Sequence, residues 1–299
     1  MRLACLAAIC GLIALAPAAA LASELFSSDM DTGAGWTIRD QADTAYTWGW
    51  DFTTMGIPAS PGGSTTGLKM EANLSASSPA YIWAVTDQTF SGQYTVEFDF
   101  WINSIGPFPA GGSGSTEFAG GGVGRADGLY SLNGAAILID GDGGSTRDWR
   151  LYKDGSEQFV ASGQYDVDTN NNSGVDLAAY FPGQAPPAYQ QTAYPGVQTG
   201  NVADGAAGFA WRHMVITVDS AAGTANYAVD GLSVGTIDAN IGNTVAMDGH
   251  AQLVYADAFS SLSGDNTLTF GVFDNFVITP EPTSLASLAV AGLLLLRRR

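Results

Sequence analysis

Short runs of alternating apolar and polar residues cover the middle of the chain, separated by clusters of Gly, Ser, Asn and Asp. The clearest run is Tyr94–Asn103, where Tyr, Val, Phe, Phe and Ile alternate with Thr, Glu, Asp, Trp and Asn. Successive side chains of a strand point to opposite faces, so this run predicts a strand with one core face and one polar face. No amphipathic helical period interrupts the pattern, which predicts an all-β antiparallel sandwich. Further strands are predicted at 46–52, 80–85, 135–139, 148–152, 214–218, 224–229 and 267–272.

Two long stretches interrupt this alternation. Residues 106–128 are rich in Gly, Pro and Ser and are expected to form a long loop. Residues 162–208 combine an Asp- and Asn-rich run with four prolines and several tyrosines. A connection of that length is unusual within a compact domain, so we expect it to be either functional or only partly ordered.

The first 22 residues carry one basic residue and an apolar run, and they end in the small-x-small sequence Ala-Leu-Ala. Such a segment is typical of a secretory signal peptide, which predicts export and cleavage before Ser23. Both cysteines, Cys5 and Cys10, lie inside it. The mature chain would therefore need no disulfide, and its core must be large enough to be stable alone.

The last twenty residues combine a proline-flanked acid, an uncharged and mostly apolar run over 283–296, and a basic end. The first part is Pro280-Glu281-Pro282, and the last is Arg297-Arg298-Arg299. In this order the segment resembles the PEP-CTERM sorting signal of Gram-negative envelope and exopolysaccharide-associated proteins, which a membrane-embedded exosortase processes. The resemblance implies the cell envelope or extracellular matrix as destination, exosortase-type machinery as partner, and transient association with the inner membrane.

The physics of this tail can be considered separately. At about 1.5 Å per residue, a helix over the apolar run would fall short of the roughly 30 Å hydrocarbon core. Three terminal arginines would stay on the cytoplasmic side and leave the domain outside. Pro280 and Pro282 resist helix and strand alike, which predicts an extended, accessible junction. A plain anchor helix without processing, or a frayed tail, is the alternative interpretation.

Between the two ends, residues 23–279 have the length of one large β domain. The whole chain has 11 Lys and Arg against 29 Asp and Glu, a net charge of −18. The ends hold four arginines and one glutamate, so residues 23–279 carry 7 basic and 28 acidic residues. Such a surface repels nucleic acid and anionic lipid, and we expect no nucleic-acid partner.

A more specific fold signal lies between Trp211 and Gly235. The sequence Trp-Arg-His, a strand, an Ala-Ala-Gly turn, and a second strand ending in Val-Asp-Gly resembles the hairpin of concanavalin A-like and laminin-G-like jelly rolls. The opening residues 29–36 and the closing residues 271–278 are similar to the first and last strands of such domains. The resemblance implies a jelly roll whose first strand lies beside its last. It also nominates Asp31 and Asp274, since in related carbohydrate-binding jelly rolls two such acids share a structural calcium ion.

Most acidic residues are Asp rather than Glu, and many of them lie beside Gly or Asn, for which there are two interpretations. Asp populates turns in all-β proteins, and Asp, Asn and backbone oxygens are also the ligands that calcium prefers. Asp166, Asp168 and Asn170 begin like an EF-hand loop, but Asn171 replaces its Gly and Leu177 its closing Glu. Asp140-Gly141-Asp142 is a second candidate loop. For Asp31 and Asp274, the alternative is that both are exposed acids in turns.

Catalysis is not indicated. Concanavalin A-like hydrolases carry both carboxylates on one strand, as E-x-D-x-x-E or E-x-D-x-E, and Glu97 and Asp99 match only the first pair. Trp101 and Ile102 stand where the second Glu would be, so the acid/base is missing. His213 is expected to be a packed or hydrogen-bonded strand residue, and with so few Cys and His we expect no zinc site.

Glycan binding remains, because sugar rings stack on exposed aromatic side chains while carboxylates accept their hydroxyls. Glu97, Asp99 and Trp101 share one strand face and are the predicted glycan ligands, with burial of Trp101 as the alternative. The aromatic row Tyr46, Trp48, Trp50 and Phe52 is interpreted as core. We therefore expect a non-catalytic polysaccharide-binding or matrix-structural protein, the alternative being a hydrolase-like sandwich with a rearranged or lost active site.

Overall fold

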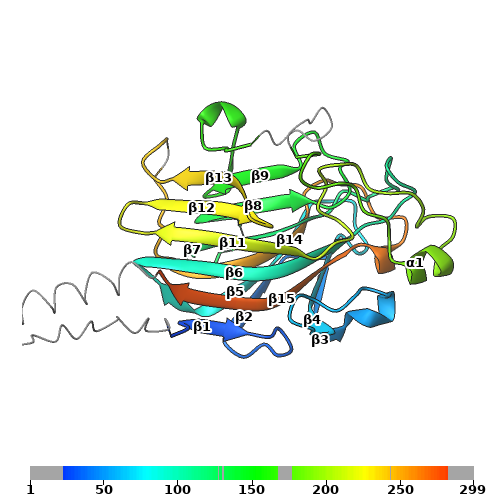
Figure 1. Ribbon diagram of the computed structural model, residues 1–299, viewed down its shortest axis with the longest axis horizontal. Helices are drawn as coiled ribbons and strands as arrows, with labels where there is room; N and C mark the ends of the chain where they lie inside the picture. The colour runs from blue at the N-terminus through cyan, green and yellow to red at the C-terminus, as the bar shows by residue number, and fades with distance from the viewer. Residues whose placement is uncertain (1–22, 127, 130, 168–176, 243, 282–299) are drawn as a thin grey trace, which may run out of the picture.

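The computed structural model describes residues 23–126, 128–129, 131–167, 177–242 and 244–281. Its strands form two antiparallel sheets stacked face to face (Figure 1). Sheet A contains β1 (Phe26–Ser28), β3 (Thr44–Asp51), β4 (Thr66–Ala72), β6 (Gln93–Asn103), β11 (Arg212–Asp219), β12 (Thr224–Val229), β13 (Leu232–Asp238) and β15 (Phe270–Pro280). Sheet B contains β2 (Trp36–Asp40), β5 (Ala80–Phe90), β7 (Phe118–Arg125), β8 (Ala135–Asp140), β9 (Trp149–Lys153), β10 (Ser156–Gln158) and β14 (Gly249–Asp257). The predicted all-β sandwich is confirmed.

The strand order places β6 and β15 in the middle of sheet A, and β7 and β14 in the middle of sheet B. Side chains between the sheets form the main core, to which β6 contributes Phe98 and Phe100 and β14 contributes Leu253 and Tyr255. Each outer face carries a further apolar cluster of its own. Because loops cover part of each outer face, several central strands are buried on both sides.

The glycine-rich stretch 118–125, expected to be loop, is a fully buried strand of sheet B. A Cβ on Gly120 would lie 2.0 Å from the carbonyl oxygen of Ile137, and one on Gly121 would lie 2.7 Å from the Phe98 ring. The neighbouring strand and the facing sheet approach so closely that only glycine fits. The loop prediction was wrong because these glycines are required by the close packing of neighbouring strands rather than by a turn.

The aromatic row predicted on one strand face is divided between the two faces of sheet A. β3 has a register shift between Thr47 and Trp50, with Gly49 at φ 62°. Trp48 therefore packs against Trp36 in the main core, whereas Trp50 packs against Phe270 in the outer cluster. Tyr46 is 44% exposed, so the row is only partly core. The bulge inverts the alternation that the sequence pattern assumed.

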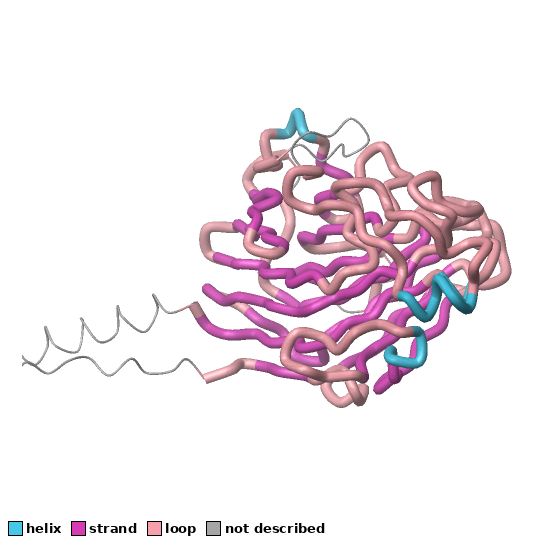
Figure 2. The backbone as a smooth tube through the Cα atoms, turned by 45° about the vertical axis from the view of Figure 1, so that its right-hand side comes forward, coloured by secondary structure: helices cyan, strands magenta, loops and turns pink. Residues whose placement is uncertain are grey.

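Most of the long connection 162–208 is packed against the sandwich rather than detached from it. Its ring Phe181 stacks on the core ring Trp149, with centroids 4.9 Å apart. It also forms α1 (Ala188–Ala193), where Gln190 donates to the carbonyl oxygen of Met55 in the 3₁₀ turn η1 (Phe52–Met55). Figure 2 shows both short helices at the end of the sandwich where long loops gather. The other 3₁₀ turns are η2 (Val160–Ser162) and η3 (Asn266–Leu268).

The first and last strands lie side by side, as the jelly-roll resemblance implied, although the first strand is 26–28 and residues 29–35 form the turn after it. Phe26 pairs with Ile278 and Ser28 with Phe276. β15 runs to Pro280, opposite Tyr94, and the backbone N–H of Glu281 donates to the carbonyl oxygen of Gln93. The side chain of Glu281 also accepts a hydrogen bond from Thr95. The junction is thus extended, as predicted, but it is docked on the sheet, and the expectation that Pro280 resists a strand was wrong because Pro280 ends β15.

Several predicted features fall outside the described residues, namely the signal peptide 1–22, Pro282, the apolar run, Arg297, Arg298 and Arg299. Within the described part of the chain, helices are too short or too polar to cross a membrane.

Candidate functional site

Two carboxylates and an imidazole form a network on the outer face of sheet A. Glu97 and Asp99 lie two residues apart on β6, and the antiparallel register places His213 of β11 opposite Asp99. The Nδ1 atom of His213 is 2.8 Å from Oδ1 of Asp99, and its Nε2 atom is 3.3 Å from Oε2 of Glu97. The imidazole ring therefore bridges the two carboxylates, and His213 is the hydrogen-bonded strand residue that was expected.

The network favours a charged imidazole. The hydrogen bond to Asp99 is the main cause that raises the pKa of His213, and the charges of Asp99 and Glu97 add to it, while burial opposes it. Asp99 is 3% exposed, whereas the side chains of Glu97 and His213 are 36% and 43% exposed. The buried carboxylate thus fixes the ring, and the accessible edge of the network is formed by Glu97 and His213.

Asn275 extends this network to β15. Its amide Nδ2 atom donates to Oδ2 of Asp99 at 2.8 Å and to the carbonyl oxygen of Pro61 at 2.5 Å. Asn275 has φ 53° and lies in a bulge between Asp274 and Val277, where β15 departs from regular pairing with β6. Asn is one of the few residues that adopt this left-handed conformation readily, so the bulge and the amide contact both account for this residue type.

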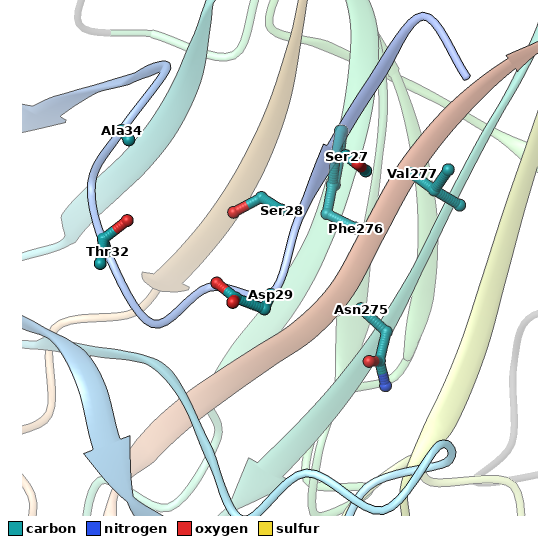
Figure 3. Close-up of a pocket in the computed structure, with 8 residues that line it drawn as sticks. All are labelled: Ser27, Ser28, Asp29, Thr32, Ala34, Asn275, Phe276 and Val277. Atoms are coloured by element: carbon teal, nitrogen blue, oxygen red, sulfur yellow. The ribbon is translucent and has the colours of Figure 1, made fainter. Parts of the chain in front are cut away.

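The same bulge coincides with a change of partner strand. β15 pairs with β4 through Gly271–Phe273 and with β1 through Phe276–Ile278. A cavity of about 560 Å³ lies beside the second segment, between β15 and the loop that follows β1. Figure 3 shows Thr32 and Ala34 on the loop across from Ser28 and Asp29, with Asn275 on β15 beyond them. The cavity therefore adjoins the carboxylate network through a shared residue.

The lining of this cavity is mainly hydroxyl, amide and carboxylate. Ser27, Ser28 and Thr32 provide hydroxyls, Asn275 an amide and Asp29 a carboxylate. Ser27, Asp29 and Thr32 are exposed. Sequence reasoning missed this group because its members are separated by about 240 residues of chain and meet only where β1 pairs with β15. The resemblance of both ends to closing strands was the one signal that could have suggested it.

Trp101 is not available to a sugar. It is 2% exposed, and it packs against Phe209 and Trp211 with ring centroids 6.3 and 6.0 Å away. The loop carrying Phe209 covers this half of the outer face, which corrects the prediction that Trp101 is a glycan ligand. Trp211 is partly exposed and its Nε1 atom donates to the carbonyl oxygen of Pro58. Its position two residues before His213, on the same strand face, was the signal for an aromatic ring beside the network.

The surroundings of Asp31 and Asp274 do not fit the prediction that they share a calcium ion. Asp274 is fully buried, and its carboxylate accepts hydrogen bonds from Ser60 Oγ at 2.6 Å and from the backbone of Asn275. Burial raises the pKa of Asp274, which disfavours the charged form that calcium needs. Asp31 is exposed in the loop after β1. Within the described ranges, no three or more Asp, Glu, His or Cys side chains are grouped so that they could hold a metal ion.

The other calcium candidates lie elsewhere. Asp166 accepts a hydrogen bond from Ser233 Oγ at 2.5 Å, while Asp168 and Asn170 lie outside the described residues. Asp140 and Asp142 are buried and accept hydrogen bonds from the backbone of Ser145 and Gly144. The turn interpretation therefore accounts for the partners seen at Asp140 and Asp142.

No protein-family model matches the chain, and no curated protein matches it. Among solved structures it is similar to a protein of unknown function with a galectin-like fold from Bacillus subtilis, at 8% identity over 87% of this chain and 98% of that chain, with a TM-score of 0.44. It is also similar to an endo-beta-1,4-glucuronan lyase from the fungus Trichoderma reesei, at 13% identity over 87% and 96%, with a TM-score of 0.44. A carbohydrate-binding module from Bacillus subtilis has 10% identity over 82% and 95%, with a TM-score of 0.40. At these TM-scores the likenesses carry no argument about function.

Proposed function

We propose that residues 23–279 form a non-catalytic carbohydrate-binding domain, which holds a glycan in the cavity between β1 and β15 and against the Glu97–His213 edge. The cavity of about 560 Å³ carries the proposal, because it lies within the size range of small-ligand sites, roughly 300–1,000 Å³. Its hydroxyls, amide and carboxylate match a ligand rich in hydroxyl groups, since each sugar hydroxyl both donates and accepts.

Hydrolysis is disfavoured by the way the acids are arranged. Retaining glycosidases need two accessible carboxylates about 5–5.5 Å apart with the scissile bond between them. Here the imidazole of His213 occupies the space between Glu97 and Asp99. Asp274 is a further carboxylate close enough for the charge of Asp99 to raise its pKa, but both Asp99 and Asp274 are buried. The acids beside the cavity are therefore better suited to hold sugar hydroxyls than to cleave a glycosidic bond.

We further propose that the protein is exported and sorted to the envelope or extracellular matrix, with exosortase-type machinery as a transient partner and a polysaccharide as its ligand. The two terminal segments of the sequence support this, as does the pairing of β1 with β15, which makes both segments leave the sandwich at neighbouring positions. Terminal sequencing of the protein recovered from a Gram-negative host that encodes an exosortase tests it. Retention of residues 1–22 in the mature protein would contradict export through a cleaved leader.

A glycan array probed with the domain tests carbohydrate binding. Thr32→Ala removes one cavity hydroxyl and should weaken binding about 2- to 10-fold, the range expected for one hydrogen bond. Ala34→Trp adds bulk at an exposed lining position and should abolish binding without burying anything new. Thr217→Ala, an exposed threonine on β11 outside the cavity, is the matched control and should bind as the unchanged domain does.

The array should be run with and without a calcium chelator, since calcium at the Asp166–Asn170 loop stays a prediction. Retention of no glycan in either condition would contradict the proposal. Equal binding by the unchanged domain and by Ala34→Trp would place the glycan somewhere other than this cavity.

A further inference from the structure

A second cavity lies on the outer face of sheet B, and its chemistry differs from that of the first. It has a volume of about 270 Å³ and is lined by Gln41, Tyr81, Trp83, Ser131, Leu132 and Tyr152. Tyr81 and Trp83 lie two residues apart on β5, and their rings stack with centroids 5.8 Å apart and an interplanar angle of 10°. Trp83 and Tyr152 are buried, whereas Tyr81 is partly exposed, so the accessible lining combines the Tyr81 ring with an amide and a hydroxyl.

Arg125 packs against the Trp83 ring of this aromatic pair. Its guanidinium lies 5.2 Å from the Trp83 ring centroid and donates to Oε1 of Gln252 and to the carbonyl oxygen of Ser131. The arginine follows Gly124 at φ 70°, a left-handed residue that breaks the strand alternation before it. Arg125 is fully buried, so the Trp83 ring is fixed in place before any ligand arrives.

The cavity offers neutral partners only. Burial raises the pKa of the Tyr152 phenol to about 12, although the nearby charge of Arg150 opposes this. The Arg150 guanidinium donates to the carbonyl oxygen of Arg147 and to the Ser145 hydroxyl. Both nearby guanidinium groups are thus engaged by protein oxygens. The described residues that line the cavity are all uncharged.

We propose that this cavity is a second glycan site, which takes one neutral pyranose ring against the partly exposed ring of Tyr81. Its volume lies just below the roughly 300–1,000 Å³ typical of larger ligands, which suits a single ring rather than an oligosaccharide. The apolar face of a pyranose would pack on the Tyr81 ring, and Gln41 and Ser131 would hydrogen-bond its edge. A uronic acid would bring a carboxylate to a site without a free cation, in a chain of net charge −18.

The first cavity lies beside the edge strand β1 of sheet A and the second on sheet B, so one molecule would bind two separate glycan chains. A monomer of this kind would cross-link a polysaccharide matrix without forming an oligomer. The second site stands on its own contacts and does not depend on the first.

Calorimetric titration of the mature chain with methyl glycosides of glucose, galactose and mannose, and with glucuronic acid, tests the site. We expect at least one neutral glycoside to bind with a Kd of about 1 mM, as weak single-ring ligands do, and glucuronic acid to bind more weakly. Tyr81→Ala should weaken that binding roughly tenfold. Ser131→Trp, which fills the cavity from an exposed rim position, should abolish it even if Tyr81→Ala fails to fold.

The matched control is Tyr46→Ala, which removes an exposed tyrosine from β3 on the other sheet and should leave this binding unchanged. Ala34→Trp should also leave it unchanged, which separates a failure of the first site from a failure of this one. Absence of binding by all three neutral glycosides, undiminished binding by Ser131→Trp, or tighter binding of glucuronic acid would each overturn the proposal.

Discussion

The two sheets are built alike, yet their outer faces differ in chemistry. Sheet A presents Glu97 and His213 at the accessible edge of a hydrogen-bonded network. Sheet B presents stacked tyrosine and tryptophan rings with guanidinium groups behind them. Of the seven basic residues between 23 and 279, five lie on sheet B or its loops: Arg39, Arg125, Arg147, Arg150 and Lys153.

This difference shows how an acidic chain uses its few cations. On sheet B, the Arg125 and Arg150 side chains are buried, where they pack against aromatic rings and donate hydrogen bonds to carbonyl oxygens. On sheet A, carboxylates are held by His213, Asn275 and Ser60 instead. One face therefore depends on buried cations, and the other depends on neutral donors together with His213, whose charge changes with pH.

The largest expected effect comes from Arg125→Met. The substitution keeps much of the apolar stem but leaves the carbonyl oxygen of Ser131 and the Gln252 amide without their donor, so we expect a loss of about 3 kcal/mol of unfolding free energy. Lys69→Met is the control on sheet A, where the ammonium lies 4.9 Å from Trp50 and pairs with the side chain of Glu71. Partial exposure should limit that loss to about 1 kcal/mol. Urea unfolding measures both, and equal losses would remove the contrast between the faces.

Asp148→Asn should change the pH dependence of stability. Asp148 is fully buried beside Asp140 and Asp142, and burial raises its pKa from 3.8 to about 7. The folded state then keeps a proton that the unfolded state releases, so the stability from this group is complete below about pH 4 and is lost as pH rises to about 7. The variant should be more stable than the unchanged protein at pH 8, by on the order of 1–3 kcal/mol. A variant that is less stable at pH 8 and keeps the full decline from pH 4 to 7 would refute this.

Asp99→Asn should disturb the sheet A network more than Glu97→Gln. Asp99 is buried and meets both His213 and Asn275, so its replacement should cost about 1–3 kcal/mol and lower the pKa of His213 toward its ordinary value. Glu97 is partly exposed, and its replacement should cost less than about 1 kcal/mol with a smaller change of that pKa. NMR titration of the imidazole signals measures the pKa, with His250 as an internal reference. A larger change in Glu97→Gln would show that the exposed acid dominates.

The smallest expected effect is the pH dependence that His213 itself contributes. Because its folded pKa is raised, its stabilisation is complete below pH 6.5, its ordinary pKa, and is lost as pH rises through the folded value. Solvent screening should keep this below about 1 kcal/mol, since the side chain is 43% exposed. Unfolding from pH 6 to 9 in the Asp148→Asn background isolates it, with His213→Gln as comparison. An unchanged slope in His213→Gln would contradict the charged bridge.

The alternating pattern predicted the fold class and several strands correctly, because burial of one strand face is a local property that recurs every second residue. It placed Glu97 and Asp99 on one face and gave His213 a hydrogen-bonded role. The pattern misled at Gly49, where one left-handed residue changes the face that the following side chains occupy. It also misled at residues 118–125, where glycine content reflects the closeness of neighbouring strands.

By itself the sequence determined an all-β core between two apolar ends, a strong excess of acids and the absence of a complete hydrolase motif. Only the tertiary structure decided that Trp101 is covered, that Glu281 is docked on β6, and that cavities form at Asn275 and at Tyr81. Periodicity reports which side of a strand a residue occupies. What covers that side depends on loops and strand partners far away in the chain, and no local pattern records their positions.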